Sequence, residues 1–534
     1  MKRKIHRIKN ALLPCVLLSA ITGVVAGILI LLFKLTVSKV TALSEQVYHA
    51  VRQRPILLPL LLLGAILLGL IVSYILKKAK QCRGGGIPTA VASIRGLVPL
   101  RWLQSIFVLF ISAMLTYLCG VPLGSEGPSV QMGTAVGKGS SDTLTKKNMA
   151  WERYLMTGGA CAGFATALGA PLTGILFAVE EIHRRFSPMI FTAAATSVFT
   201  ATVTQEILAG LLQVDVALFH FPKELDLPLH LLWLPIIIGG LCGLMAILFT
   251  KFYRFIRTWN AKSLKKIPLS VKVVLIFAAS AILGFLCEDF IGSGHALIEK
   301  ILHGHTVWYL LLAAFVIRAL LMLTANCSGI TGGMFIPILT FGAIVSALIA
   351  GIFSALGLVD PVYLSILIAI GMASFLAAAY RTPLAALAFT LEVLCGVGNI
   401  LPVGIAIAIA YLTIEVFHIP SFNDTVIEAK TEAERAGKTA LVVETELTVE
   451  PDAFAIGHEV HNILWPPTCT VLRIDKSNPN SDHLITEGDV LHLHYQTFDP
   501  DQTMYYLEQL LGHQVKKAKL RSHVEKKNEE IPSD

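Results

Sequence analysis

Apolar runs long enough to cross a lipid bilayer constrain this chain more than any other feature of its sequence. A spanning helix needs about 20 apolar residues, and its backbone polar groups must be paired within the segment. Only 15% of the 534 residues are charged, against about 25% in a typical soluble protein. The sequence therefore predicts a polytopic membrane protein with an all-α membrane part. The expected spans lie near residues 11–36, 56–76, 102–121, 189–212, 230–250, 270–287, 307–325, 340–358, 361–379 and 400–418.

The apolar character ends near residue 420, and the charge changes sign there. After residue 420 the chain has 20 acidic and 11 basic residues, which leaves 16 acidic and 32 basic residues before it. We therefore expect a membrane domain over residues 1–425, a second domain over 430–515 and a charged, frayed tail over 516–534. Positive charge in short loops is typical of the cytoplasmic side of a membrane, so it does not indicate nucleic-acid binding.

Basic residues also predict the orientation of the chain in the cell membrane. The N-terminus, Met-Lys-Arg-Lys, is expected to be cytoplasmic and to lead into a retained anchor. His183-Arg184-Arg185 and residues 251–266 mark further cytoplasmic ends. The acidic second domain would then be cytoplasmic as well.

The second domain is expected to be a small α+β domain. Residues 440–448, 469–475 and 489–496 predict strands, while residues 453–463 and 503–512 have helical spacing. The sequence of this domain has neither a GxGxxG motif nor a P-loop, so nothing in it favours nucleotide binding. No cofactor and no metal site are expected.

The membrane part contains an internal repeat. Residues 159–180 (GACAGFATALGAPLTGILFAVE) and 371–392 (GMASFLAAAYRTPLAALAFTLE) align without gaps. The matching positions include two glycines, two prolines and two glutamates: Gly159 with Gly371, Pro171 with Pro383, and Glu180 with Glu392. Helices broken at corresponding places in two repeats are typical of transporters, where they form a central binding site.

Three glycine–proline motifs predict an anion site made of backbone amides. They are GGGIP at 84–88, GSEGP at 124–128 and GGMFIP at 332–337. Glycine lets the backbone approach a ligand closely, and proline suits the first turn of a helix. Each motif therefore predicts a helix start with free amides and the positive end of the helix dipole. Three such ends directed at one point would bind an anion without a costly charged side chain in the membrane.

These motifs, together with GAPLTGILFAVEE and the second repeat, resemble the CLC family of chloride channels and proton–chloride antiporters over most of residues 10–425. The resemblance implies an inverted-repeat CLC fold and a homodimer in which each protomer has its own pathway. The second domain resembles the C-terminal half of the regulatory domains attached to many potassium transporters (TrkA-C type), through its strand pattern and Gly488-Asp489. A domain of this type leaves room for an unknown small ligand.

Two glutamates are the candidate catalytic residues. Glu126 lies in the GSEGP loop, where a carboxylate competes with a bound anion and loses its charge when protonated. The resemblance implies that Glu126 is the external gate and a proton acceptor. It also places Glu181 at the internal proton-transfer glutamate, which is typical of antiporters; a salt bridge from Glu181 to Arg184 or Arg185 is the alternative. Glu180, by its place in the repeat, is expected to be structural.

The expected anion-binding residues include two departures from the family pattern. The serine of the family's GSGIP motif is Gly85 here, and the family's anion-binding tyrosine falls, by its distance from Pro420, at Phe422. Both hydroxyls would be missing, so we expect weaker chloride binding and poorer discrimination against nitrate. The full expected set is Gly85, Gly86, Ile87, Gly124, Ser125, Gly127, Met334, Phe335, Ile336 and Phe422.

The sequence thus favours a non-enzymatic exchanger of chloride against protons. A passive voltage- or pH-gated chloride channel is the alternative within the same fold, and fluoride export is less favoured because Glu181 is present. From another class, Glu180-x-x-His183 and Glu415-x-x-His418 each fit half of a di-iron site. A cation transporter regulated by its tail is a further alternative, although the sequence has no TVGYG filter of a potassium channel.

Overall fold

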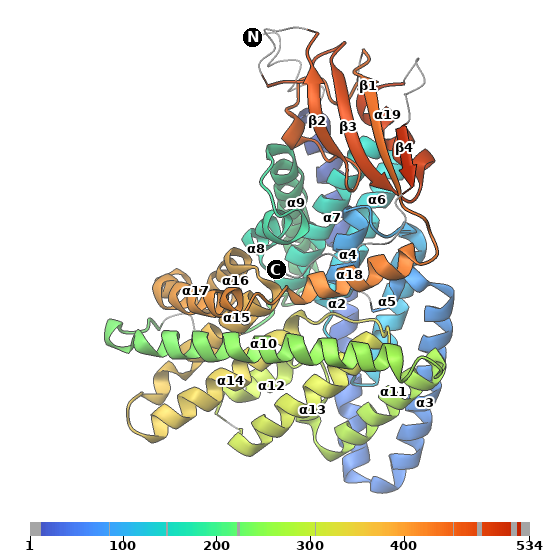
Figure 1. The fold of residues 1–534 in the computed structure, drawn as a ribbon. Helices are drawn as coiled ribbons and strands as arrows, with labels where there is room; N and C mark the ends of the chain where they lie inside the picture. Colours follow the sequence, from blue (N-terminus) through green and yellow to red (C-terminus); the bar gives the residue numbers. More distant parts are fainter. Residues whose placement is uncertain are drawn as a thin grey trace.

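The computed structural model describes residues 12–84, 86–145, 148–221, 225–304, 306–451, 453–477 and 483–513, and the backbone of residues 521–524. A helical domain lies below a small domain with one β-sheet in the view of Figure 1. The helical domain comprises α2 (Leu13–Gln53), α3 (Leu58–Lys78), α4 (Ile87–Ile94), α5 (Trp102–Leu118), α6 (Glu126–Leu144), α7 (Met149–Leu168), α8 (Pro171–Phe177), α9 (Pro188–Leu212), α10 (Trp233–Lys262), α11 (Leu269–Leu286), α12 (His295–Leu302), α13 (Trp308–Cys327), α14 (Phe335–Ala355), α15 (Leu364–Tyr380), α16 (Pro383–Phe389), α17 (Ile400–Val416) and α18 (Phe422–Arg435).

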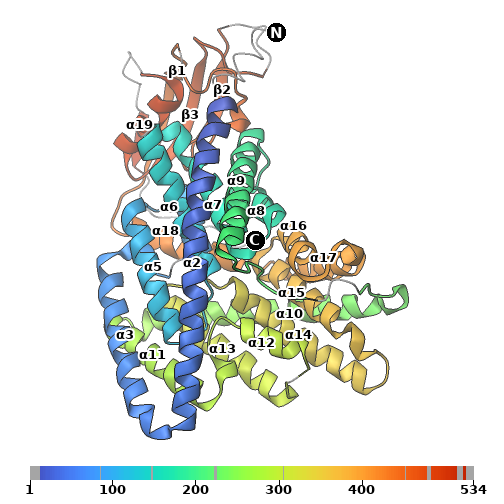
Figure 2. The same cartoon turned by 180° about the vertical axis from the view of Figure 1, so that it is seen from behind.

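The predicted all-α membrane domain is confirmed, with changes in the lengths of some spans. Within the described ranges, eight helices are long and apolar enough to cross a membrane. The first expected run, 11–36, continues as α2 to Gln53. Figure 2 shows this helix extending from beneath the sheet to the opposite end of the molecule. The run near 102–121 forms the shorter helix α5, of 17 residues.

The two copies of the sequence repeat form the same series of elements. Helix α7 is followed by α8 and a π-helical turn, Ala178–Ile182; helix α15 is followed by α16 and a second π-helical turn, Thr390–Cys395. Each break has the same cause. The long helix ends at a left-handed residue, Gly169 (φ 69°) or Arg381 (φ 58°), and a proline opens the short helix two residues later.

The two repeats hold each other through a reciprocal pair of carboxylate caps. Glu180, in the first π-helical turn, accepts hydrogen bonds from the amides of Leu384 and Ala385 at the start of α16 (2.9 and 2.7 Å). Glu392, in the second, accepts from the amide and the hydroxyl of Thr173 at the start of α8 (2.9 and 2.7 Å). A carboxylate satisfies free amides and the helix dipole at such a position. The structural role expected for Glu180 is therefore confirmed.

Glycines let the long helices of each repeat approach their neighbours closely. A Cβ atom on Gly133 of α6 would lie 2.2 Å from the carbonyl oxygen of Gly159 on α7. A Cβ atom on Gly342 of α14 would lie 2.4 Å from the carbonyl oxygen of Gly371 on α15. Small residues at helix interfaces give this kind of packing in membranes. It brings the starts of α6 and α14 into the centre of the domain.

The second domain is a four-stranded antiparallel sheet with one helix. Its elements are β1 (Leu441–Thr448), β2 (Thr470–Asp475), β3 (Val490–Thr497), α19 (Pro500–Leu511) and β4 (Arg521–Val524), with strand order β2-β3-β1-β4. The three expected strands and the expected helix at 503–512 are confirmed. Strand β4 pairs with β1, so the sheet extends into residues 516–534, which were expected to be frayed. Helix α18 crosses the boundary expected between 425 and 430.

The helix expected over residues 453–463 is wrong. This segment forms turns and a short 3₁₀ helix, Val460–Asn462. Local turn hydrogen bonds, such as that from the Ile456 amide to the Ala453 carbonyl, alternate with bonds to other segments: the Ala455 amide donates to the carbonyl of Leu510, and the Gly457 amide donates to that of Ile485. The helical spacing of apolar residues therefore reflects burial between α19 and the turns, not an α-helix.

The second domain contacts the helical domain through its own backbone carbonyls. Arg153 on α7 donates to the carbonyl of Trp465, and Tyr154 donates to that of Asn462 (2.9 Å). Arg185, just after the first π-helical turn, donates to the carbonyl of Ile463 (3.0 Å). The sheet domain is thus seated on the ends of the elements that lead to Glu181, as Figure 1 shows for α7.

We predict that Glu392→Gln and Glu180→Gln each lower the thermal unfolding midpoint of the purified protein. The amide cannot supply two acceptor oxygens or a negative charge, and hydrogen bonds to charged groups contribute about 1.5–3 kcal/mol. Glu432→Gln, at a side chain that is 67% exposed, is the control and should leave the midpoint unchanged. Equal midpoints for all three variants and the wild type would contradict the role of the caps.

Candidate functional site

The three glycine–proline motifs meet at one place. Gly124 and Gly333 form an antiparallel β-bridge, in which each amide donates to the other carbonyl (2.7 and 2.6 Å). A Cβ atom on Gly127 would lie 2.6 Å from the Cα atom of Gly333 and 2.8 Å from that of Gly86. Side chains are excluded at this crossing, because real Cβ contacts are longer. The starts of α4, α6 and α14 therefore converge, as the motifs predict.

The starts of α4 and α14 provide buried amides without helical partners. Ile87 begins α4 and Phe335 begins α14, with Met334 as the capping residue, and the first amides of a helix have no acceptor in the helix. Met334, Phe335 and Ile336 are 2–5% exposed. The Gly86 amide is already used, because it donates to the side chain of Gln131 (3.0 Å). The expected site residue Gly85 lies outside the described residues.

Glu126 is buried at the start of α6, beside the bridge. Its side chain is 1% exposed, and its Oε1 accepts a hydrogen bond from the Ser125 hydroxyl (3.0 Å). Its Oε2 has no hydrogen-bond partner among the described residues. Ser125 thus contacts the Glu126 carboxylate itself. Lys34 on α2, which the motifs do not mark, has an attractive Coulombic interaction with Glu126 and donates to the carbonyl of Val216 (2.6 Å).

Glu181 is buried in the first π-helical turn and bound on one side. Its Oε1 accepts a hydrogen bond from the amide group of Asn423 (2.8 Å), on the first turn of α18. Glu181 Oε2 and Asn423 Oδ1 have no hydrogen-bond partner within the described ranges. Arg184 pairs with Asp424 (2.8 Å) and Arg185 donates to a backbone carbonyl. The alternative of a salt bridge from Glu181 to either arginine is therefore wrong.

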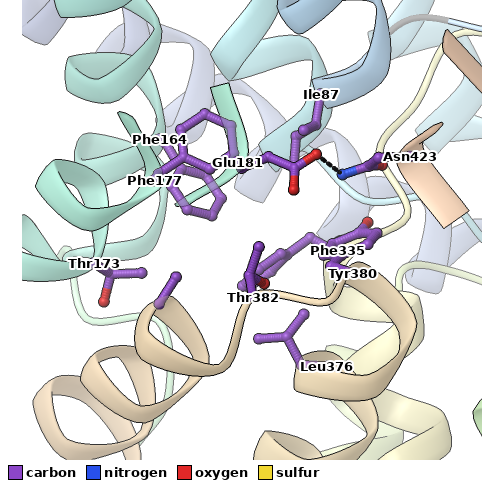
Figure 3. A pocket seen from close by; sticks show the side chains of 11 residues that line it. Ile87, Phe164, Thr173, Phe177, Glu181, Phe335, Leu376, Tyr380, Thr382 and Asn423 are labelled. Atoms are coloured by element: carbon purple, nitrogen blue, oxygen red, sulfur yellow. Dashed lines mark hydrogen bonds between the residues drawn. The ribbon is translucent and has the colours of Figure 1, made fainter. Parts of the chain in front are cut away.

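Glu181 and the two free helix starts line the same small pocket. Ile87 and Phe335 border it, together with Tyr380 and Asn423 (Figure 3). Sequence reasoning missed Asn423 and Tyr380. A comparison of the two repeats could have drawn attention to Tyr380, because this polar aromatic residue stands where the first copy has the apolar Leu168.

Phe422 does not line this pocket, although the spacing from Pro420 places it at the family's tyrosine. Its side chain is 1% exposed, and its ring packs against Tyr253 and Phe249 at centroid distances of 4.7 and 6.0 Å. The next residue, Asn423, reaches the pocket instead. The start of α18 at Phe422 decides which of the two side chains faces Glu181.

The glutamates of the possible di-iron motifs have other partners. Glu180 caps α16, and Glu415 forms an ion pair with Arg381. His183 lies within hydrogen-bond distance of the Thr157 hydroxyl (2.8 Å). In the part of the chain that the structure describes, no group of three or more His, Cys, Asp or Glu side chains could hold a metal ion.

Broken helices from two repeats, meeting at a buried site with two carboxylates, define the class of inverted-repeat membrane transport proteins. Residues 68–415 match the family described as voltage gated chloride channel. This match covers more than half of the chain, and the chain belongs to that family. The resemblance to the CLC family is thereby confirmed.

Individual relatives and solved structures agree with this assignment. The chain is 28% identical over 456 residues to the H(+)/Cl(-) exchange transporter ClcA of Klebsiella pneumoniae subsp. pneumoniae, covering 82% of this chain and 94% of that protein. For ClcA of Salmonella paratyphi B the identity is 29% over 458 residues, with 82% and 93% covered. The fold is similar to a slow cyanobacterial Cl-/H+ antiporter (TM-score 0.73, 24% identity, 79% and 99% covered) and to a CLC-type fluoride/proton antiporter (TM-score 0.62, 21% identity, 75% and 95% covered).

Proposed function

We propose that this protein exchanges chloride for protons across the cell membrane. The observation that carries the proposal is a pair of buried carboxylates, Glu126 and Glu181, each with one oxygen that has no partner among the described residues. Glu181 lines one pocket with Tyr380 and the free helix starts, and Glu126 lies at the start of the neighbouring helix α6. The relatives named as H(+)/Cl(-) exchange transporters support the antiporter over the channel alternative.

In this proposal the helix starts bind the anion and Glu126 is the gate. The amides of Ile87, Phe335 and Ile336 donate to the anion, within a cradle that Gly86, Gly124, Ser125, Gly127 and Met334 shape. Phe422 contributes through its packing. Ionised, the Glu126 carboxylate competes with chloride for the positive helix ends. Protonated, it loses its charge and yields the site, which makes anion movement depend on a proton.

Glu181 is the inner proton-transfer group in the same proposal. Asn423 holds Oε1 by a hydrogen bond, so the partner-free Oε2 faces the pocket and takes or releases the proton. A buried carboxylate without a second partner is costly when ionised, which favours protonation as an anion enters nearby. The proton on Glu181 and the anion at the helix starts then lie close together, and the site as a whole carries little net charge.

The orientation, the assembly and the tail complete the proposal. Arg95, Arg153 and Arg185 lie on the side of the sheet domain, and positive charge favours the cytoplasmic side; the sheet domain is therefore cytoplasmic.

Both glutamates and the helix starts come from one chain, which fits a homodimer with one pathway in each protomer. The sheet domain is a TrkA-C-like regulator, and a cleft beside His461 and Lys476 is its site for a small ligand.

The first test changes the gate. Glu126→Ala removes the titratable group and leaves the amides in place, so proton movement should be abolished while chloride flux continues. The measurement is simultaneous recording of proton and chloride flux from proteoliposomes. Uphill proton pumping by this variant, driven by a chloride gradient, would refute the role of Glu126.

The second test changes the inner group. Glu181→Gln preserves the volume but cannot carry a proton, so we expect loss of proton transport with retained chloride flux in the same assay. Glu432→Gln, at a side chain that is 67% exposed, provides the control and should keep the ratio of protons to chloride. A wild type that moves chloride but no protons would leave the passive channel as the function.

The third test removes the sheet domain. Helix α18 carries Asn423 into the pocket, and its Lys430 donates to the carbonyl of Arg83 (2.7 Å). A chain ending after Gly437 keeps these contacts and should retain measurable exchange, with altered regulation. A chain ending after Ile419 loses Asn423 and should lose proton coupling. Absence of anion flux from a folded protein ending after Gly437 would show that the sheet domain is part of the pathway.

A further inference from the structure

Tyr380 brings a phenol into the pocket from a position that the glycine–proline motifs do not mark. It is the last residue of α15, and the left-handed Arg381 ends the helix there. Arg381 is fixed by its ion pair with Glu415 and by a hydrogen bond to the carbonyl of Ile419 (3.3 Å). The Tyr380 side chain is 5% exposed. In Figure 3 it lies beside Phe335, across the pocket from Glu181.

The Tyr380 hydroxyl is available to a ligand. In the described ranges, the printed ring contacts of its side chain are with Phe335 and Phe422, at 6.2 and 6.4 Å between centroids. A buried tyrosine hydroxyl normally has a hydrogen-bond partner. The pocket, whose other borders include the helix starts at Ile87 and Phe335, is where this partner would lie.

The position of Tyr380 also explains how this chain can do without a tyrosine at 422. The Phe422 ring is in aromatic contact with Tyr380 but does not line the pocket. The hydroxyl beside the pocket thus belongs to Tyr380 on α15, whose ring neighbours that of Phe422 on α18. The side chain that reaches the pocket from α18 is Asn423, and its amide donor is already used by Glu181.

We propose that the Tyr380 hydroxyl is a direct ligand of the transported anion and replaces the hydroxyl that Phe422 lacks. This assignment rests on the proposed exchange function and names a further group of the same site. The pocket leaves about 10 Å³ for the centre of a particle the size of water, which is room for about one such particle. The ligand is therefore a single small anion, bound by one phenol and the amides of two helix starts.

The test is calorimetric titration of the purified full-length protein with chloride. Tyr380→Phe removes one oxygen atom and should weaken chloride binding by roughly tenfold or more, because a hydrogen bond to a charged group is lost. Tyr253→Phe is the matched control: Tyr253 is 3% exposed and contacts Phe422 but does not line the pocket, so binding should be unchanged. The double variant Tyr380→Phe with Phe422→Tyr asks whether the second ring can supply the hydroxyl.

Each outcome decides the assignment. Weaker chloride binding by Tyr380→Phe, with Tyr253→Phe like the wild type, supports it, and recovery by the double variant strengthens it. Unchanged chloride binding by Tyr380→Phe overturns it; if proton flux falls at the same time, the phenol carries protons instead. Flux of the wild type tests the proposed function separately. A wild type that moves no protons, combined with weaker binding by Tyr380→Phe, would refute exchange and keep Tyr380 as an anion ligand.

Discussion

The two carboxylates that cap the opposite repeat, Glu180 and Glu392, fix the geometry on which the site depends. Each stands in a π-helical turn and binds the start of the other repeat's short helix. Adjacent residues on a helix point about 100° apart. Once Glu180 is held by α16, the direction of the next side chain is largely determined, and Glu181 faces the pocket. The contact that joins the repeats therefore also orients the proposed proton-transfer group.

The anion cradle depends on the absence of side chains as much as on the amides. At the crossing of Gly127 with Gly86 and Gly333 there is no space for a Cβ atom. Close approach brings the helix ends together, and their dipoles add at one point. The carboxylate of Glu126 lies at the start of α6 beside this crossing, so the proposed gate and the proposed anion cradle form one electrostatic unit. Tyr380 and Asn423 add polar groups on the side of Glu181.

Much of this arrangement could be predicted from the sequence, and the remainder depends on tertiary contacts. The repeat and the three motifs mark the broken helices because glycine and proline act locally. The partner of Glu181 could not be predicted, since Asn423 reaches it across 242 positions of sequence. The spacing from Pro420 predicted the correct segment for a residue at the pocket. At the start of α18, however, Asn423 lines the pocket and Phe422 does not. Residues 453–463 have helical spacing because both sides of an irregular segment are buried, and periodicity alone does not distinguish the two cases.

The contact between the two domains has an unequal dependence on sequence. On the side of the sheet domain, Asn462, Ile463 and Trp465 take part through main-chain oxygens, which every amino acid possesses. On the side of the membrane domain, the donors are the side chains of Arg153, Tyr154 and Arg185. Substitutions of Asn462, Ile463 or Trp465 keep these hydrogen bonds as long as the loop keeps its shape. The side chain of Phe454 is different, because its ring packs against Trp151 and Tyr154 of the membrane domain. The loop that carries the three carbonyls can therefore change its side chains over evolution without losing these hydrogen bonds, whereas Phe454 and the three donors are constrained by the contact.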